Sequence, residues 1–191
     1  MCAKQSKKLD KALLVGQCVY IRAPRQHDCD EFIALNQISR HFHKGWSYPP
    51  IKPTQYAEYM KRCRRSDFAG FFVCRVIEGD IIGSINLSQI CRGSFQSAYL
   101  GYQIGAPYAS QGYMTEAIQL VLQYAFLKLK LHRIEANIQP TNLASLALVK
   151  RAGFTLEGYS RRYLKIGGRW RDHERWAILV EEWQAKKRPR R

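Results

Sequence analysis

The order of strand-like and helix-like segments predicts a mixed fold, α/β or α+β, with one mostly antiparallel sheet covered by helices. Three observations lead to this prediction. Short runs rich in β-branched and aromatic residues alternate with longer amphipathic stretches. Hairpin turns are recognisable at Glu78–Gly79–Asp80 and at Gly167–Gly168. A strand-helix-strand crossover between residues 97 and 139 puts one parallel pair in the middle of the sheet.

The first half of the chain is expected to contain two helices and four strands. Asp28 precedes the first helical pattern and can cap it. The expected strands are 17–23, 68–77, 80–90 and 97–105, and the expected helices are about 28–42 and 54–65.

The second half begins with the clearest helical pattern, which follows Gly112 and keeps its polar residues on one stripe. Residues 132–139 are then expected to form a strand. Pro140 opens another helix, which Gly153 closes. The segments FTLEGYSRRYLKI and RWRDHERWAILVEEW are expected to be the last two strands.

Length and composition predict a single domain. The chain has 191 residues, of which 46% are hydrophobic, and no apolar run is long enough to cross a membrane. We expect a basic N-terminal extension over residues 1–15, a domain over 16–183 and a disordered basic tail over 184–191. A cytoplasmic, membrane-free protein is the expectation, as a monomer or homodimer.

The formal net charge of +16 is large for this length. Such a field favours polyanions, which include RNA, a ribonucleoprotein or an anionic cofactor, although a solvated charged surface is an equal alternative. The six cysteines contain no CxxC pair, so free thiols and no metal site are expected.

The stretch APYASQGYMTEA, residues 106–117, places a turn of small residues between a strand and a long helix. A helix N-terminus offers unpaired amides and a partial positive charge, which suit a bound anion. An ordinary strand-to-helix turn is the alternative.

The chain resembles the GNAT acetyltransferases, and within them the RimJ/RimL-type ribosomal-protein alanine N-acetyltransferases, with RimJ as the closest likeness. The segments that carry the resemblance are YLGYQIG-APYASQGYMTEA, HRIEANIQPTNLASLALVKRAGF and GYSRRYLKIGGRWRDHERWAIL, and it covers roughly residues 16–183. It implies splayed central strands, acetyl-CoA as the donor without a metal, and direct acetyl transfer. The implied acceptor is the α-amino group of a protein, in particular a ribosomal protein that begins with Ala or Ser.

The resemblance also implies the donor-binding residues. The strand Tyr102, Gln103 and Ile104 would pair with the pantetheine arm. The family loop pattern is Gln/Arg-x-x-Gly-x-Gly/Ala, from which this chain departs at Pro107 and Ser110. The pyrophosphate would lie on the loop and first helical turn, that is, on Ser110, Gln111, Gly112, Tyr113, Met114 and Thr115.

For the chemistry, many members of the family carry a tyrosine acid where this chain has Val149. Ser145 matches the N-x-x-S pattern and could protonate the leaving sulfur, although a first-turn serine is the alternative. Asn142 could bind the donor or simply cap the helix. Glu135 is the candidate base, with a salt-bridged strand carboxylate as the alternative. Asp172 is expected to anchor the last hairpin.

For the acceptor, Trp46 and Tyr48 lie in a segment that resembles the family's Pro/Trp stretch beside the substrate groove, or they cover the core as loop aromatics. Arg92 precedes the central strand, where a peptide or acidic partner could pass. Two other functions remain open. One is acetylation of a small amine such as a polyamine. The other is a non-catalytic ribosome- or RNA-binding module on the same scaffold.

Overall fold

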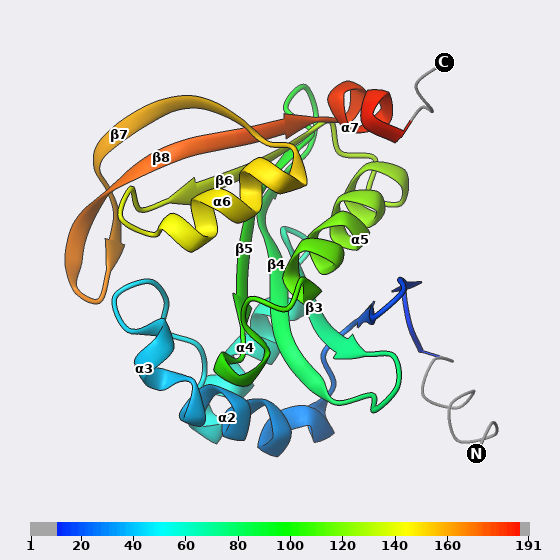
Figure 1. Ribbon diagram of the computed structural model, residues 1–191, viewed down its shortest axis with the longest axis vertical. Coiled ribbons are helices and arrows are strands. Elements are labelled where there is room, and N and C mark those ends of the chain that lie inside the picture. The colour runs from blue at the N-terminus through cyan, green and yellow to red at the C-terminus, as the bar shows by residue number, and fades with distance from the viewer. Residues whose placement is uncertain (1–10, 188–191) are drawn as a thin grey trace.

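The computed structural model describes residues 11–187 and contains one eight-stranded sheet with helices on both faces (Figure 1). The strand order in the sheet is β1-β2-β3-β4-β5-β6-β8-β7. The strands are β1 (Leu14–Val15), β2 (Val19–Arg22), β3 (Phe68–Arg75), β4 (Ile81–Cys91), β5 (Ser97–Ile104), β6 (Arg133–Ile138), β7 (Thr155–Ile166) and β8 (Arg169–Leu179). This architecture confirms the predicted fold class.

Two helical layers enclose the sheet. One core cluster packs α5 and α6 against one face, and the other packs α2 and α4 against the opposite face of β2, β3 and β4. The helices are η1 (Gln26–Asp28), α2 (Cys29–Ile38), α3 (Arg40–His43), α4 (Pro53–Cys63), η2 (Ala106–Tyr108), α5 (Tyr113–Leu127), α6 (Leu143–Ala152) and α7 (Val180–Lys187).

Strands β5 and β6 form the expected parallel pair, but they pair over three residues only. Ser97, Ala98 and Tyr99 face Arg133, Ile134 and Glu135, and the ladder then ends. Beyond Tyr99, β5 continues to Ile104 and pairs only with β4 on its other side. The splayed central strands are therefore present, and they leave the inner edge of residues 100–104 without a ladder partner.

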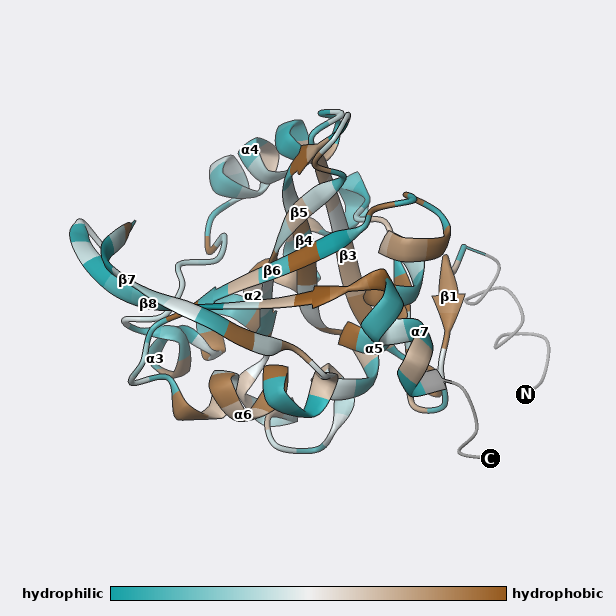
Figure 2. Ribbon diagram, turned by 90° about the horizontal axis from the view of Figure 1, so that it is seen from above, coloured by the Kyte–Doolittle hydropathy of each residue, from teal (hydrophilic) through white to brown (hydrophobic). Residues whose placement is uncertain are grey.

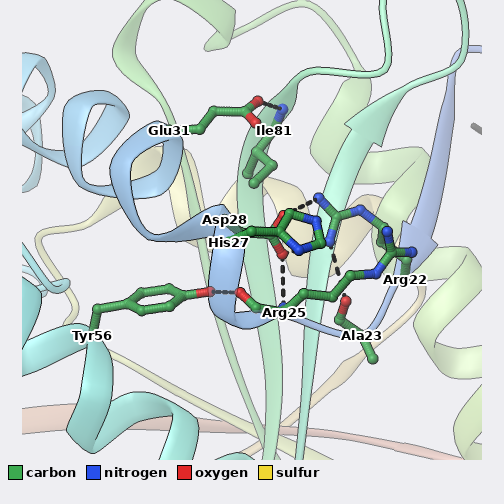
Figure 3. A network of polar contacts seen from close by, with 8 residues as sticks. All are labelled: Arg22, Ala23, Arg25, His27, Asp28, Glu31, Tyr56 and Ile81. Atoms are coloured by element: carbon green, nitrogen blue, oxygen red, sulfur yellow. Dashed lines mark hydrogen bonds and ion pairs between the residues drawn. The ribbon is translucent and has the colours of Figure 1, made fainter.

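A buried ion pair fixes the start of the α2–α4 layer. Arg22 donates to both carboxylate oxygens of Asp28 at 2.7 and 2.9 Å, and both side chains are almost fully buried. Asp28 also accepts from the Arg25 N–H, and Tyr56 donates to the Arg25 carbonyl (Figure 3). This network joins β2, η1 and α4. Burial alone would lower the pKa of the Arg22 guanidinium, but the hydrogen bonds to Asp28 raise it, so Arg22 stays protonated.

Two boundaries differ from the predictions. The helix expected over 28–42 is broken at Ser39, whose hydroxyl accepts a hydrogen bond from the Ala106 N–H at 2.9 Å. The last strand was expected to reach residue 183, but it ends at Leu179, where α7 begins. Glu182 accepts from the Leu179 N–H at 2.9 Å and so starts this helix.

The ends of the chain can be compared with the expected tails only in part. Residues 184–187, placed in the predicted disordered tail, form the end of α7, and Lys186 donates to the Gly153 carbonyl at 2.8 Å. Residues 1–10 and 188–191 lie outside the described residues. No helix within residues 11–187 is long and apolar enough to cross a membrane.

Candidate active site

A cavity of about 1000 Å³ opens where β5 and β6 separate. One part of its wall comes from the splayed end of β5, the loop before α5 and the first turns of α5 and α6. The other part comes from α3 and its following loop, the end of β6, and the β7–β8 hairpin. We call these the α5–α6 end and the α3–hairpin end. Among the described residues that line it, Arg151 carries the only formal charge, and none is Asp or Glu.

The α5–α6 end is rich in free backbone donors. Gly112 precedes α5 with a φ of +84°, no side chain caps the helix, and the first helical hydrogen bond runs from Glu116 N–H to the Gly112 carbonyl. The amides of Tyr113, Met114 and Thr115 therefore point along the helix axis without an acceptor among the described residues. Arg151, on α6, lines the same cavity. This end is suited to an anion.

Ser145 and Tyr102 meet across this part of the cavity. Their hydroxyl oxygens are 2.5 Å apart, and burial raises the pKa of Tyr102 to about 12. Asn142 caps α6, because its side-chain oxygen accepts from the Ser145 N–H at 3.2 Å, and it also lines the cavity. Asn142 therefore acts as a helix cap through its side-chain oxygen, and its amide nitrogen remains available to donate a hydrogen bond into the cavity.

The α3–hairpin end contains two buried histidines. Burial lowers the pKa of both His43 and His173, so both imidazoles tend to be neutral. His43 Nε2 and Asn137 Oδ1 are buried and have no hydrogen-bond partner among the described residues. Phe42, Trp46, Leu164 and Ile166 supply the apolar wall beside them.

The tautomer of His173 follows from the hydrogen bond of its Nδ1. Its Nδ1 lies 3.0 Å from the Arg171 carbonyl oxygen, and since a carbonyl only accepts, Nδ1 must carry the proton. Nε2 of the neutral ring is then a lone-pair acceptor. His173 therefore contributes a base to the cavity wall.

Most of the sequence-predicted residues line this one cavity. They are Trp46, Tyr102, Gln103, Ile104, Ser110, Gln111, Gly112, Tyr113, Met114, Thr115, Asn142 and Ser145. Their shared location is consistent with the predicted roles, and those roles remain predictions.

Three predicted residues lie elsewhere. Glu135 is paired with Arg133 at 2.8 Å on the β6 surface and does not line the cavity, as its salt-bridge alternative expects. Arg92 donates to the Leu129 carbonyl and the Gln96 side chain, at the opposite end of β5. Tyr48 is exposed, and its hydroxyl packs against Gly167 in the hairpin turn.

The sequence prediction did not include Arg151, Asn137 or His43 as site residues, it interpreted His173 as a structural partner of Asp172, and it gave Tyr102 a backbone role only. The strand alternation of β8 was the available signal for His173, because a histidine among charged neighbours had to face one side of the sheet. Asp172 does anchor the last hairpin, as predicted. It accepts from the Tyr159 hydroxyl at 2.6 Å and from the Arg162 N–H at 2.7 Å.

A bound metal has no obvious place in the described part of the chain. Within residues 11–187, no three His, Cys, Asp or Glu side chains are grouped closely enough to hold one.

Residues 19–155 match the family model described as an acetyltransferase (GNAT) domain. The chain is 36% identical over 177 residues to the probable N-acetyltransferase YjcK of Bacillus subtilis, an alignment that covers 87% of this chain and 97% of the relative. It is 43% identical over 106 residues to the [ribosomal protein uS5]-alanine N-acetyltransferase of Escherichia coli, covering 56% of this chain and 55% of that protein.

A solved structure of Mycobacterium smegmatis RimJ in complex with CoA-disulfide superposes on this chain with a TM-score of 0.79. The sequence identity is 27%, and the superposition covers 86% of this chain and 83% of that one.

Proposed function

The chain belongs to the acetyltransferase (GNAT) domain family, and within it we propose that the protein acetylates the α-amino group of a protein N-terminus, in particular a ribosomal protein that begins with Ala or Ser. As a member of this family it is an acetyl-CoA-dependent N-acetyltransferase. The acceptor is the part that the proposal adds.

The observation that carries the proposal is the absence of carboxylates among the described residues that line the cavity. A polyamine or an aminoglycoside brings several positive charges into the site, and each would be desolvated without a counter-ion. An acceptor with one ammonium group, which loses its charge before reaction, avoids this cost. The cavity therefore favours a singly charged amine over a small polycation.

Among single amines, an α-amino group is the easiest to deprotonate. Its pKa is about 8, against roughly 10.4 for a lysine side chain. A neutral imidazole is a sufficient proton acceptor for the first and a weak one for the second. His173, with its Nε2 lone pair in the α3–hairpin end, is the residue to which we assign this role, and Glu135 is not assigned it.

The cavity fits the family's donor at its α5–α6 end. Acetyl-CoA, when bound, supplies a thioester that an amine can attack. The unpaired amides of Tyr113, Met114 and Thr115 would hold the pyrophosphate, and Arg151 would attract a further phosphate. The unpaired inner edge of β5, from residue 100 to 104, would hydrogen-bond the pantetheine arm and polarise the thioester carbonyl through a backbone N–H.

The residues then have separate tasks in the transfer. With acetyl-CoA bound, a bond would form between the amine nitrogen and the acetyl carbon, and the carbon–sulfur bond would break. His173 Nε2 would take the proton that the ammonium loses before attack. Ser145 would give its hydroxyl proton to the departing sulfur, and the second proton, which the nitrogen loses after attack, would restore Ser145 through solvent and the Tyr102 hydroxyl, 2.5 Å from Ser145 Oγ. Asn137 Oδ1 would accept a hydrogen bond from the acceptor, and His43 Nε2 would form one with it as donor or acceptor according to its tautomer, which gives these buried atoms partners.

Two further facts support a ribosomal acceptor. A relative of this chain is named for acetylating the alanine of ribosomal protein uS5. The chain's net charge of +16 would also favour contact with a ribosomal particle.

Thiol release from acetyl-CoA tests the proposal. Short peptides with N-terminal Ala, Ser, Thr or Met are offered with free or blocked α-amines, and spermidine serves as the polycationic control. Turnover restricted to unblocked Ala and Ser peptides is the expected result. Faster turnover with spermidine would overturn the acceptor assignment while leaving the acetyltransferase activity intact. Tight binding of acetyl-CoA without turnover on any amine would point to a binding module.

A further inference from the structure

The outer part of the β7–β8 hairpin concentrates positive charge. Residues 161–171, which we call the hairpin tip, contain no Asp or Glu and five exposed cations, namely Arg161, Arg162, Lys165, Arg169 and Arg171. None of these five side chains forms a hydrogen bond or ion pair that the described residues provide. Asp172, which follows the tip, is a nearby carboxylate whose pKa is lowered by a hydrogen bond from Tyr159, and Arg161 and Arg162 contribute to this lowering. It brings one negative charge beside five positive ones, and like charges in excess repel one another, so the tip is suited to an anionic partner.

The tip also exposes aromatic side chains. Trp170 is 61% exposed, and Tyr159, at the base of the tip, is 53% exposed. An indole left in water costs hydrophobic free energy, and it offers a flat face on which a nucleobase can stack. Four of the five cations are arginines, whose planar guanidinium groups bind phosphates with two hydrogen bonds and stack on bases.

The cations lie on both faces of the tip. Arg171 pairs across the strands with Leu164, and Arg169 with Ile166, so these two arginines share the face that lines the cavity. Lys165 pairs with Trp170 on the other face. The hairpin curves away from the body of the protein and ends in a hydrophilic arm (Figure 2). A projecting arm that is basic on both faces fits between phosphate backbones better than against a flat acidic protein surface.

A strand irregularity holds two of the arginines outward. The pairing of β7 and β8 shifts between Ser160 and Leu164, so Arg161, Arg162 and Tyr163 form a bulge opposite Asp172. Arg162 has a φ of +48°, and its N–H is held by Asp172 at 2.7 Å. A non-glycine residue in the left-handed region is strained, and Asp172 keeps it there. A concavity beside the bulge is lined by Ser160, the three bulge residues and Asp172.

We propose that the hairpin tip is an RNA-binding surface that docks the enzyme beside its acceptor. The same hairpin supplies Leu164, Ile166 and His173 to the α3–hairpin end of the cavity, so RNA held at the tip lies next to the acceptor entrance. Under the proposed function, on which this location of the acceptor rests, the acceptor N-terminus would be presented by a protein already bound to RNA. The tip itself recognises phosphates and unstacked bases without needing a particular sequence.

The test measures binding of a short fluorescein-labelled single-stranded RNA to the full chain by anisotropy, over a range of salt concentrations. The variant R161Q/R162Q/R169Q/R171Q removes four tip charges. The control variant K52Q/R64Q/K128Q/K130Q removes four exposed charges from other surfaces, and none of these four side chains forms a hydrogen bond or ion pair with the described residues. Thermal unfolding checks that each variant is folded, and the pair R161Q/R162Q replaces the fourfold variant if that one is not.

The tip variant should bind at least tenfold more weakly at physiological salt, and its salt slope should fall by about 3, since each phosphate contact with a single strand contributes about 0.7. For the pair alone, the slope should fall by about 1.4. The control variant should lose much less. W170A should weaken binding while leaving the salt slope unchanged, because stacking releases no counter-ions.

Equal losses in the tip and control variants would overturn the proposal, since they would show that net charge alone attracts RNA. A labelled polyglutamate peptide that binds the tip as tightly as RNA would overturn it in favour of an acidic protein partner. Peptide acetylation is measured separately on the wild-type protein, so loss of the RNA result and loss of the proposed function are distinguishable.

Discussion

In the half of the sheet formed by β2, β3 and β4, aromatic rings are buried against one another, whereas in the half that ends with the β7–β8 hairpin two aromatic rings in the outer part of the hairpin face solvent. Phe32, Tyr56, Tyr59 and Phe72 form one cluster with ring centroids 4.5–6.5 Å apart. Trp170 and Tyr159 are more than half exposed. The two halves meet at β5 and β6, where the cavity opens.

This difference indicates that the first half mainly provides stability and that the hairpin mainly provides a binding surface. The first half holds the buried ion pair Arg22–Asp28 under a packed aromatic layer. The second half instead carries the five exposed cations of the hairpin tip, none of which forms an ion pair within the described residues. Changes in the first half should lower the free energy of unfolding, changes at the junction should lower turnover, and changes in the hairpin should affect binding.

The largest effect is expected from Asp28→Ala. It would leave the Arg22 guanidinium buried without a counter-charge, which destabilises a protein by about 3–5 kcal/mol. Urea unfolding measures this change. Arg161→Ala in the hairpin is the matched control and should stay within about 0.5 kcal/mol of the wild type. A similar loss in both variants would contradict the division of the sheet into two halves.

The next effect concerns the junction. Ser145→Ala should lower kcat by about 10²-fold, the lower end of the range for a general acid, while the dissociation constant of acetyl-CoA stays nearly constant. Tyr102→Phe acts through the same hydroxyl pair, so the double variant should be no worse than Ser145→Ala alone. Steady-state kinetics on the four proteins measures the coupling. Additive losses would show that the two hydroxyls work independently.

His173→Gln should lower kcat/KM for a peptide by a similar factor near neutral pH, and less as the pH approaches the pKa of the α-amine, because the acceptor then loses its proton unaided. Wild-type kcat/KM should fall on the acid side at a pKa below 6.5, since burial lowers the pKa of His173. A pH profile measures both. An unchanged acid limb in His173→Gln would exclude His173 as the proton acceptor.

His43 and His173 also determine the direction in which stability changes with pH. The pKa values of His43 and His173 are lowered on folding, so the unfolded chain binds more protons between the folded values and 6.5. The contribution of these two histidines to the free energy of unfolding should therefore be fully present above pH 6.5. It should be lost as the pH decreases through their lowered folded-state pKa values.

The smallest effect is expected at Gly112, and Gly168 is its control because the two glycines have nearly the same φ angle. Gly112 (φ +84°) and Gly168 (φ +81°) both have open space where a Cβ would lie. Alanine at either position costs about 1–2 kcal/mol of left-handed strain. Only Gly112→Ala places a methyl group beside the proposed pyrophosphate site, so only it should weaken acetyl-CoA binding, by several-fold. Calorimetric titration measures both, and equal affinities would remove the loop from the donor site.

The fold could be predicted because its signals are local. The hairpin turn at 78–80, the crossover from 97 to 139 and the helix after Gly112 each follow from short stretches of sequence. The break at Ser39 could not, because its cause is a hydrogen bond to Ala106, 67 residues away. The start of α7 was missed because the apolar run of β8 extends through Val180, although Glu181 and Glu182, in the first turn of the helix, mark the change.

The candidate site divides in the same way. The loop from Ser110 to Thr115 carries its own motif, so its place beside the cavity could be predicted. Tyr102 and Ser145 lie on different elements, and nothing in either segment indicates that their hydroxyls meet. His173 and His43 acquire their lowered pKa values from burial that only the folded chain provides.

A peptide that offers two kinds of amine shows which of them the enzyme acetylates. The peptide carries an N-terminal Ala and an internal lysine, it is incubated with the enzyme and acetyl-CoA, and tandem mass spectrometry locates the acetyl group. We expect acetylation of the alanine α-amine, with the lysine unmodified. Acetylation of the lysine side chain, with the α-amine left free, would contradict this expectation.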